Sequence, residues 1–288
     1  MQTLDMLQKR IKTTNDLLSV VRTMKSLAAV NIRHFERAAQ SLTQYAEVVE
    51  QGWTVLFRSV GFLLPVHREE RSVVLVVGSD QGMCGQFNEL SMQAALELGA
   101  TLTGKGMDVA FWTAGARVRV RLEDSGKDAV VHFPIPGTLG GVDSTVGDIV
   151  ENMAQWQRHD AARFYVVHNA QNESEGYTPL VHRVLPLDRA WTEERSGASW
   201  PGRCLPQAMI PGETLFTGLF EQHLFVSLYG ALARSMAAEN AARLAAMQAA
   251  EKNIEEMRES LESDFRRTRQ TAITDELLDI VAGFEAMS

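Results

Sequence analysis

The residues best suited to chemistry lie in a glycine-rich run at positions 78–88, GSDQGMCGQFN, directly after an apolar segment. A phosphate-binding P-loop needs a lysine followed by serine or threonine after its second glycine, and a dinucleotide-binding turn needs glycines in the order G-x-G-x-x-G. Neither pattern is present. Because glycines also supply the positive φ angles of tight turns, we interpret the run as a structural turn, with phosphate binding as the less favoured alternative.

Cys84, within the same run, is a nucleophile only if the fold brings a histidine to it as a base. The histidines available for this role are His67, His132, His168 and His182. No Cys–His family signature accompanies them, so a buried or loop thiol is the favoured interpretation. An α/β enzyme that uses Cys84 is kept as an alternative.

Metal and acid–base sites are not indicated. The seven histidines show neither H-x-x-x-H nor H-E-x-x-H spacing, and no carboxylate pair stands out. The two cysteines, Cys84 and Cys204, are far apart and form no zinc or disulfide pattern. The sequence therefore predicts no catalytic residue, no cofactor-binding residue and no metal ligand, and its cysteine usage favours a reducing, cytoplasmic setting.

Composition narrows the function classes further. The chain has 288 residues and a net charge of −8, with 45% hydrophobic and 22% charged residues. Nucleic-acid binding depends on summed positive charge, so an acidic chain argues against a nucleic-acid partner. No run of about 18 uninterrupted apolar residues predicts a membrane span. The first residues, MQTLDMLQKRIK, lack the apolar block of a signal peptide and enter a helical pattern at once.

The middle of the chain alternates apolar, β-branched runs with helical patterns. The expected strands are Arg71–Val77, Asp108–Thr113, Val130–Ile135, Arg163–Asn169 and an edge strand at Thr178–Leu187, and the expected helices are Glu89–Thr103, Ala116–Glu123 and Val146–Trp156. Such alternation favours a mainly parallel, Rossmann-like sheet with helices on both faces. Residues from Asp188 to Pro211 hold three of the eight prolines, and we expect an irregular connector there.

The first 60 residues contain no proline and carry a helical stripe. Steps of three and four residues pass through Leu4, Leu7, Ile11, Thr14, Leu18, Val21, Lys25, Ala28, Ile32, Phe35, Ala39, Leu42, Ala46, Val49, Trp53, Leu56 and Val60. All but Thr14 and Lys25 are apolar, and the mean step is the coiled-coil period. The stripe predicts a long helix with a helical partner.

The partner is expected at the other end of the chain. Residues 213–288 also lack proline and are rich in strong helix formers, which predicts one helix of about 70 residues, roughly 110 Å long. Its matching stripe is Leu244, Met247, Ala250, Ile254, Met257 and Leu261. The two helices pair most simply as an antiparallel coiled coil.

The expected fold is therefore α/β, with a Rossmann-like domain inserted between two long helices that form a stalk. The expected divisions are an N-terminal stalk helix at 1–60, an α/β domain at 68–190, a connector at 191–212 and a C-terminal stalk helix at 213–288. The second helix is longer, so it should outrun the first by about 15 residues, or ~20 Å.

This overhang is apolar over a wide arc. It contains Ile273, Leu277, Leu278, Ile280, Val281, Phe284 and Met287, which cover about half of the helix circumference. Exposed apolar surface of this kind usually marks an interface, so we expect another protein to enclose it. Arg266, Arg267 and Arg269 precede it, and residues 1–37 carry seven basic against three acidic side chains, a local excess of four. Lys25 interrupts the apolar stripe. Two interpretations of these charges stay open: they cover solvated faces of the helices, or they orient an acidic partner.

Four ordered motifs resemble the gamma subunit of rotary F-type ATP synthases. They are Arg10-Ile11-Lys12 with residues 21–29 (VRTMKSLAA), the loop at residues 79–88 (SDQGMCGQFN), residues 239–247 (ENAARLAAM) with 250–253, and residues 269–276 (RQTAITDE) with Asp279 and Gly283. The resemblance covers the whole chain. It departs from the family pattern at Asn31, Met83, Gln86 and Phe284, which indicates a divergent branch, with a sodium-transporting bacterial type as one candidate.

The resemblance implies a rotor of the central stalk. It implies partners in the α and β subunits at three each to one of this chain, in the epsilon subunit and in the ring of c subunits, with rotation coupled to ATP synthesis or hydrolysis. No cofactor and no active site of its own are implied, and the expected location is peripheral, on the cytoplasmic face of the bacterial inner membrane. The partner-binding residues that it implies are Met24, Lys25, Arg269, Gln270, Thr274, Glu276, Leu277, Ile280 and Phe284. A coiled-coil scaffold with a ligand-binding α/β domain is the alternative from another class.

Overall fold

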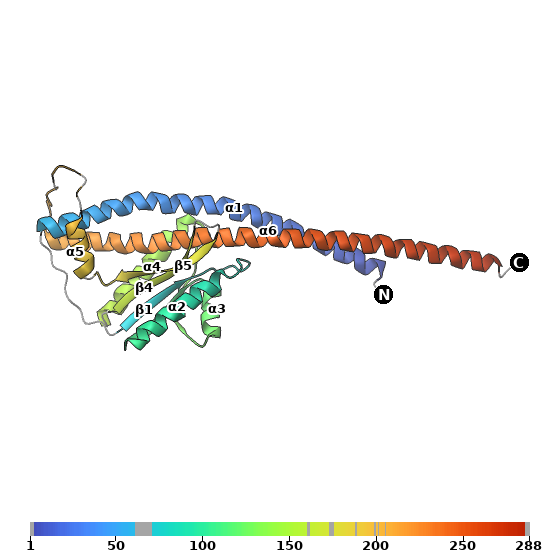
Figure 1. Cartoon of the computed structure of the whole chain (residues 1–288), viewed down its shortest axis with the longest axis horizontal. Coiled ribbons are helices and arrows are strands. Elements are labelled where there is room, and N and C mark those ends of the chain that lie inside the picture. The colour runs from blue at the N-terminus through green and yellow to red at the C-terminus, as the bar shows by residue number, and fades with distance from the viewer. Residues whose placement is uncertain are drawn as a thin grey trace. The chain divides into compact units, whose positions relative to one another are not determined.

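The computed structural model describes residues 3–60, 71–159, 162–172, 176–187, 189–198, 200, 202–204 and 206–285 (Figure 1). Two compact units make up the chain. Residues 1–29 with 243–288 form the first, here called the stalk unit, and residues 30–242 form the second, the domain unit. Both units contain parts of the same two long helices, so each unit is described by itself.

The N-terminal helix α1 spans Leu4–Val55 and continues as a short π-helix, Leu56–Val60. Thr3 precedes it and accepts the backbone N–H of Met6 on its hydroxyl and that of Leu7 on its carbonyl, so it satisfies amides at the helix start. Every described side chain of the expected stripe, from Leu4 to Leu56, is buried or half-buried. The apolar period that was read from the sequence is therefore the face that α1 packs.

The C-terminal helix α6 spans Gly212–Glu285, 74 residues without a break. Its pairing with α1 is antiparallel in both units. In the domain unit, Tyr45 donates a hydrogen bond to Gln222 at 2.5 Å, and in the stalk unit, Arg22 contacts Glu251. Within the stalk unit, Leu7 of α1 lies beside Asp275 of α6, whereas Arg22 contacts Glu251. Within the domain unit, Leu42 lies beside Gly230 and Gly52 beside Leu219. In each unit a higher residue number on α1 pairs with a lower one on α6, which confirms the expected antiparallel arrangement.

The expected α6 stripe is wrong at one residue, Met257, which does not lie on the packed face. Met257 is 53% exposed, whereas Ile254, Arg258 and Leu261 are buried or half-buried. The packed face steps by four residues at this point, so the aliphatic stem of Arg258 takes the place that we expected for Met257.

A five-stranded sheet forms the centre of the domain unit, in the order β3-β2-β1-β4-β5. The strands are β1 (Arg71–Val77), β2 (Asp108–Ala114), β3 (Ala129–Phe133), β4 (Ala162–Gln171) and β5 (Tyr177–Leu185). The pairs β1–β2, β1–β4 and β2–β3 are parallel, and β5 is an antiparallel edge strand. The mainly parallel sheet and its edge strand are as expected.

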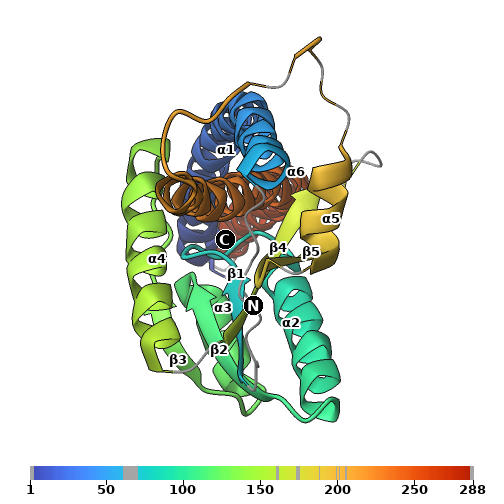
Figure 2. The same ribbon diagram turned by 90° about the vertical axis from the view of Figure 1, so that its left-hand side faces the viewer.

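Helices cover both faces of the sheet (Figure 2). The shorter helices are α2 (Phe87–Gly104), α3 (Ala116–Asp124), α4 (Val142–His159) and α5 (Arg189–Gly197), with a 3-10 turn at Leu139–Gly141. Val73, Leu75 and Val77 of β1 pack against α4 and α6, and the alternate residues Val74 and Val76 pack against α2 and α3. This alternation is that of a strand buried on both faces.

Helix α5 lies where we expected only an irregular connector. Trp191 packs edge-to-face on Trp53 of α1, with ring centroids 5.2 Å apart, and also contacts Phe57. A helix of nine residues is not stable alone, so this aromatic cluster holds it. The expected division of the chain at 60, 68, 190 and 212 stays a prediction.

Candidate partner-binding surface

The end of α6 presents an apolar surface to solvent within the stalk unit. Among the residues of α6 whose burial is described, Ala272 is the last half-buried one, and every residue from 273 to 282 is exposed. The large apolar side chains of this segment are Ile273, Leu277, Leu278, Ile280 and Val281, with exposed fractions between 48% and 61%. We call residues 273–285 the apolar tip. So many exposed aliphatic side chains on one short segment mark an interface.

The tip is exposed because α1 begins beside the residues that precede the tip. Leu7, in the first turns of α1, lines a hollow with Arg267, Thr271 and Asp275 of α6. Since α1 begins at Leu4, nothing on α1 reaches the residues that follow. The expected overhang is therefore present. The side chains of Phe284 and Met287 lie outside the described residues.

The four polar residues expected at the interface lie at the base of the tip. Arg269, Gln270, Thr274 and Glu276 are all exposed. The hydroxyl of Thr274 donates to the carbonyl of Gln270 at 2.9 Å, a bond within the helix. Arg269 and Glu276 are seven residues apart, so they lie on one face of the helix, separated by two turns.

Met24 and Lys25 lie on α1 and are half-buried. Lys25 is paired with Glu251 of α6, and Glu251 also accepts from Nε of Arg22 at 2.8 Å, while a terminal nitrogen of Arg22 lies 2.6 Å from Glu255. The Lys25 ammonium and then the Arg22 guanidinium hold the pKa of the Glu251 carboxyl below its ordinary value. The charge of Lys25 is thus already compensated within the chain.

A second apolar stripe on α1 was missed by the sequence reading. Met6, Leu17, Val20 and Leu27 are between 52% and 59% exposed and lie one residue before the positions of the packed stripe. Their spacing of 3, 7 and 11 places them on one face together with Met24. A search for a second period of three and four residues would have found this stripe, which extends the exposed apolar surface of the stalk unit.

The glycine-rich run at 78–88 has a structural role. Asn88 donates to the hydroxyl of Ser79 at 2.8 Å and to the thiol of Cys84 at 3.5 Å, and its carbonyl accepts from the backbone of Ser79 at 2.9 Å. Cys84 is 2% exposed and packs with Phe87 against Ala238 of α6. The loop bends at positive φ at Met83 and Gly85.

This loop occupies the place where open α/β sheets bind ligands. That place is the carboxyl edge at the point where strand order reverses, which here lies between β1 and β4. Asn169 of β4 donates to the carbonyl of Phe87 and to the hydroxyl of Ser91, both at 2.8 Å, so it holds the loop against the sheet. The hydrogen bonds and packing favour the structural turn over phosphate binding.

Asp80 completes the loop's attachment. One carboxylate oxygen accepts from the backbone of Ala116 at the start of α3, at 2.7 Å, and the other accepts from the backbone of Ile135 at 3.1 Å. Gly115, at φ +115°, passes so close to the backbone of Ser79 that a Cβ there would lie 2.8 Å from its nitrogen. The run therefore ties three strand ends together.

Metal and membrane sites were also sought. Within the described ranges, no group of three or more histidine, cysteine, aspartate or glutamate side chains could hold a metal ion. In the same part of the chain, no helix is long and apolar enough to cross a membrane. His67, one of the histidines considered as a base for Cys84, lies outside the described residues.

Comparison with known families identifies the family of the whole chain. The model of the ATP synthase family matches residues 3–287. The chain belongs to the ATP synthase family. The ATP synthase gamma chain of Polynucleobacter necessarius is 26% identical over 98% of both chains, and that of Granulibacter bethesdensis is 28% identical over the full length of both. The resemblance drawn from the four motifs is confirmed.

Solved structures show the same fold. A chain of the Euglena gracilis mitochondrial ATP synthase, from a structure of its OSCP, F1 and c-ring, aligns with a TM-score of 0.67 at 14% identity, over 99% of this chain and 94% of that chain. A second chain, from the rotor of the same enzyme, aligns with a TM-score of 0.63. The expected fold, two long helices flanking an α/β domain, is therefore confirmed.

Proposed function

We propose that this chain is the central-stalk rotor subunit of an F-type ATP synthase, which couples ion-driven rotation of the c-ring to ATP synthesis or hydrolysis in the α3β3 hexamer. The observation that carries the proposal is the apolar tip. Five large aliphatic side chains stay exposed at the end of a 74-residue helix. A hydrophobic sleeve of α and β subunits, in which the tip turns, accounts for this surface. Family membership supplies that sleeve.

The two long helices suit the transmission of torque. Helix α6 runs without a break from Gly212 to Glu285, and each unit holds it against α1. In the stalk unit, Arg22 and Lys25 clamp Glu251 from the neighbouring helix. Because the packed face and the ion pairs resist sliding of one helix past the other, a twist applied at one end is carried along the pair.

Partner contacts are assigned by position. We propose that Arg269, Gln270, Thr274 and Glu276 form hydrogen bonds with a loop of the hexamer, and that Leu277, Ile280 and Phe284 turn within its apolar sleeve. Met24, with the exposed stripe of Leu17, Val20 and Leu27, faces the β subunits on this proposal. The ion pair between Lys25 and Glu251 fixes the orientation of α1. An acidic segment of a β subunit that contacts Lys25 must share the ammonium group with Glu251.

The α/β domain and the segment before α6, from Cys204 to Met209, are proposed to dock the epsilon subunit and the c-ring. Met209 is 89% exposed and Cys204 is exposed, in the segment before α6. Such an exposed methionine is suited to an adaptable apolar contact. The chain would then be peripheral to the membrane, on the cytoplasmic face of a bacterial inner membrane. Identities below 30% to the gamma chains above fit a divergent branch, and sodium transport stays one candidate for it.

Co-purification tests the proposal. The chain, expressed with its α and β subunits, should elute as a complex with three of each to one copy of this chain, and that complex should hydrolyse ATP. Recovery of the chain only as a free monomer or homodimer, in the presence of folded α and β, would contradict the rotor function. The scaffold alternative predicts that second result. The scaffold alternative needs a ligand site in the α/β domain, but the loop at residues 78–88 fills the carboxyl edge of the sheet where such a ligand would bind.

A further inference from the structure

Over most of the domain unit, α1 lies on α6 and not on the sheet. Figure 2 shows α6 between α1 and the sheet, and Figure 1 gives the same order from another side. Among the described residues, the core cluster on this face of the sheet contains six buried side chains of α6 and one of α1, Phe35. A hollow of about 390 Å³ lies among α1, β5, α5 and α6, and Leu42 of α1 and His182 of β5 both line it. Beyond Phe35, the described part of α1 therefore packs on α6 rather than on the sheet.

Helix α5 reaches α1 at the side of α6. It follows the edge strand β5 directly in the chain, so the sheet anchors its start. The ring of Trp191 packs edge-to-face on Trp53 of α1, with centroids 5.2 Å apart, and on Phe57, with centroids 5.9 Å apart. The same ring lies 5.5 Å from the ring of His223 of α6. Trp53 is completely buried, so these contacts belong to a packed aromatic cluster. One side chain of α5 therefore contacts both long helices.

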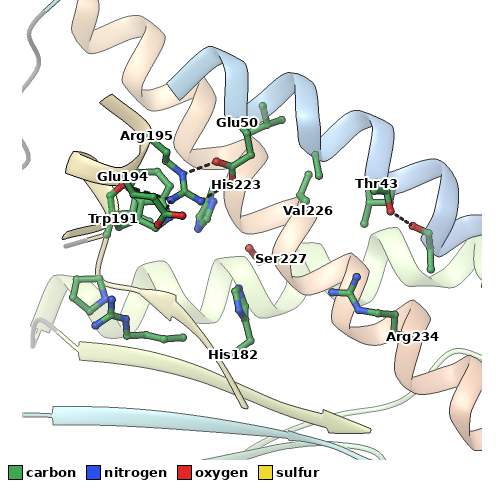
Figure 3. Close-up of a pocket in the computed structure, with 17 residues that line it drawn as sticks. Thr43, Glu50, His182, Trp191, Glu194, Arg195, His223, Val226, Ser227 and Arg234 are labelled. Carbon is green, nitrogen blue, oxygen red and sulfur yellow. Dashed lines mark hydrogen bonds and ion pairs between the residues drawn. The ribbon is translucent and has the colours of Figure 1, made fainter. Parts of the chain in front are cut away.

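Arg195 adds a polar contact between α5 and α1 (Figure 3). Its Nε lies 2.5 Å from one carboxylate oxygen of Glu50, and a terminal nitrogen donates to the other oxygen at 3.0 Å. The guanidinium also lies 3.8 Å from the centre of the Trp191 ring. At the end of α5, Arg58 donates to the carbonyl of Ala198 at 3.3 Å. An arginine that pairs with both oxygens of a carboxylate and lies over an aromatic ring has a fixed orientation, so α5 holds this part of α1 at several points.

These contacts oppose the motion that a pair of helices resists least. Hydrophobic packing is non-directional, so an apolar seam allows one helix to roll over the other more readily than it allows them to separate. A third element that holds α1 from the side blocks this roll. To turn on α6, the end of α1 would have to break both the Trp191 cluster and the ion pair of Arg195 with Glu50.

We propose that α5 is a clamp that fixes the carboxyl-terminal part of α1 to the α/β domain, so that torque entering through the domain reaches α1 as well as α6. Trp191 and Arg195 are its positioning residues, because they act by holding α1 in place. The role in torque rests on the rotor function proposed above, whereas the clamp itself is a property of the isolated chain.

Hydrogen exchange of the isolated full chain, followed by mass spectrometry, tests the clamp. Arg195→Gln and Trp191→Ala should each speed the exchange of backbone amides at residues 49–58 by at least about tenfold, the effect of losing a charge-assisted pair or a packed ring. The amides of β1 should keep their protection, because neither residue belongs to the core cluster of the sheet. Unchanged exchange at residues 49–58 in both variants would overturn the clamp.

Arg119→Gln is the matched control. Arg119 also pairs with a glutamate, Glu123, with its Nε 2.7 Å from the carboxylate, but both residues lie on α3 and the pair joins no two elements. Its loss should leave exchange at residues 49–58 unchanged. A rise equal to that of Arg195→Gln would show that the exchange reports a general loss of stability and would count against the clamp.

The role in torque is tested on the holoenzyme in vesicles, by measuring ATP hydrolysis and the ions transported per ATP. Arg195→Gln should keep hydrolysis and lower the transport per ATP several-fold, and Arg119→Gln should match the unaltered enzyme. Normal transport per ATP in a variant whose α1 exchanges fast would overturn this role. Failure of the unaltered chain to assemble or to couple would instead contradict the rotor function, and the exchange measurement would still decide the clamp.

A covalent link separates loss of the clamp from misfolding. Glu50→Cys with Arg195→Cys, in a chain that also carries Cys204→Ser, removes the ion pair and places one thiol on each helix. Cys84 is 2% exposed and stays protected in the folded chain. Joining the two new thiols with a short bismaleimide should return both the exchange at residues 49–58 and the transport per ATP to the values of the Cys204→Ser reference. A link that leaves both at their unlinked values would overturn the proposal.

Discussion

The ammonium of Lys25 on α1 forms an ion pair with the carboxylate of Glu251 on α6, and the same carboxylate accepts Nε of Arg22 at 2.8 Å. The pair joins residues 226 positions apart in the sequence. Lys25 interrupts an apolar stripe, and this contact explains how the stripe tolerates it. The stalk unit therefore contains a register-specific cluster of ion pairs among apolar contacts, which disfavours sliding of α1 along α6.

This relationship predicts a measurable coupling between Lys25 and Glu251. In a double-mutant cycle, Lys25→Met and Glu251→Gln should each lower the midpoint of urea unfolding, and the double variant should lose less than the sum of the two. The coupling should shrink as salt rises, because the carboxylate is partly exposed. Circular dichroism at the helix band measures it. Strictly additive effects at low salt would show that the pair does not act as a clamp.

Charge substitutions in the apolar tip should separate assembly from stability. Leu277 and Ile280 are 58% and 57% exposed, so Leu277→Asp and Ile280→Asp should change the free energy of unfolding of the isolated chain by less than about 0.5 kcal/mol. Within the proposed sleeve the same carboxylates would be buried without partners, which is strongly unfavourable. Recovery of the complex with α and β should therefore fall severely. Arg266→Ala, just before the tip, is the control, and equal, negligible effects of all three substitutions would refute the buried tip.

Asp80 should contribute to the stability of the domain unit. Asp80→Ala removes both acceptors for the backbone N–H groups of Ala116 and Ile135, which should cost about 1 to 2 kcal/mol. Asp80→Asn keeps one acceptor oxygen and should cost less. Urea unfolding measures both values, with Asp128→Ala, an exposed loop aspartate, as the control. An Asp80→Ala variant as stable as that control would show that the two bonds contribute nothing.

The two cysteines should differ sharply in reactivity. Cys204 is exposed, and Cys84 is 2% exposed and hydrogen-bonded within its loop. A maleimide should modify Cys204 within minutes in the folded chain and reach Cys84 only after unfolding in guanidinium chloride. Mass spectrometry of the two tryptic peptides gives the result. Rapid modification of Cys84 in the native chain would contradict this prediction and support the alternative of an enzyme that uses Cys84 as a nucleophile.

His168 should make the domain unit less stable in acid. It is 2% exposed, both ring nitrogens lack partners in the described part of the chain, and burial, followed by the charges of Arg234 and His182, lowers its pKa to about 3. An unfolded histidine has a pKa of about 6.5, so below that pH the unfolded chain binds the proton more tightly. Stability that is complete well above pH 6.5 is therefore lost progressively as pH falls toward 3, by about 1.4 kcal/mol per pH unit.

His168→Leu checks this dependence. The leucine fills a similar volume and cannot titrate, so the difference in free energy of unfolding between about pH 7.5 and about pH 5.5 should be smaller by roughly 1 kcal/mol. The difference that remains comes from other groups, including His223, whose pKa is lowered in the same direction. An unchanged pH difference in the variant would show that His168 is protonated without cost.

The sequence by itself determined the helices and strands other than α5. The stripe from Leu4 to Leu56 and the run Arg71–Val77 are local patterns, and periodicity is a local property that each segment carries with it. The apolar tip was predicted from the difference in length between the two expected long helices. The family motifs were also local, since they are short runs of neighbouring residues in a fixed order.

Only the tertiary structure decided the contacts between distant segments. The sequence does not identify Glu251 as the partner of Lys25. Their pairing depends on the register of the two helices, and the apolar stripes of these helices permit several registers. The exposure of Met257 and the helix α5 that Trp191 holds against Trp53 have the same origin. Each depends on side chains that only folding brings within a few ångströms, where charge and packing act.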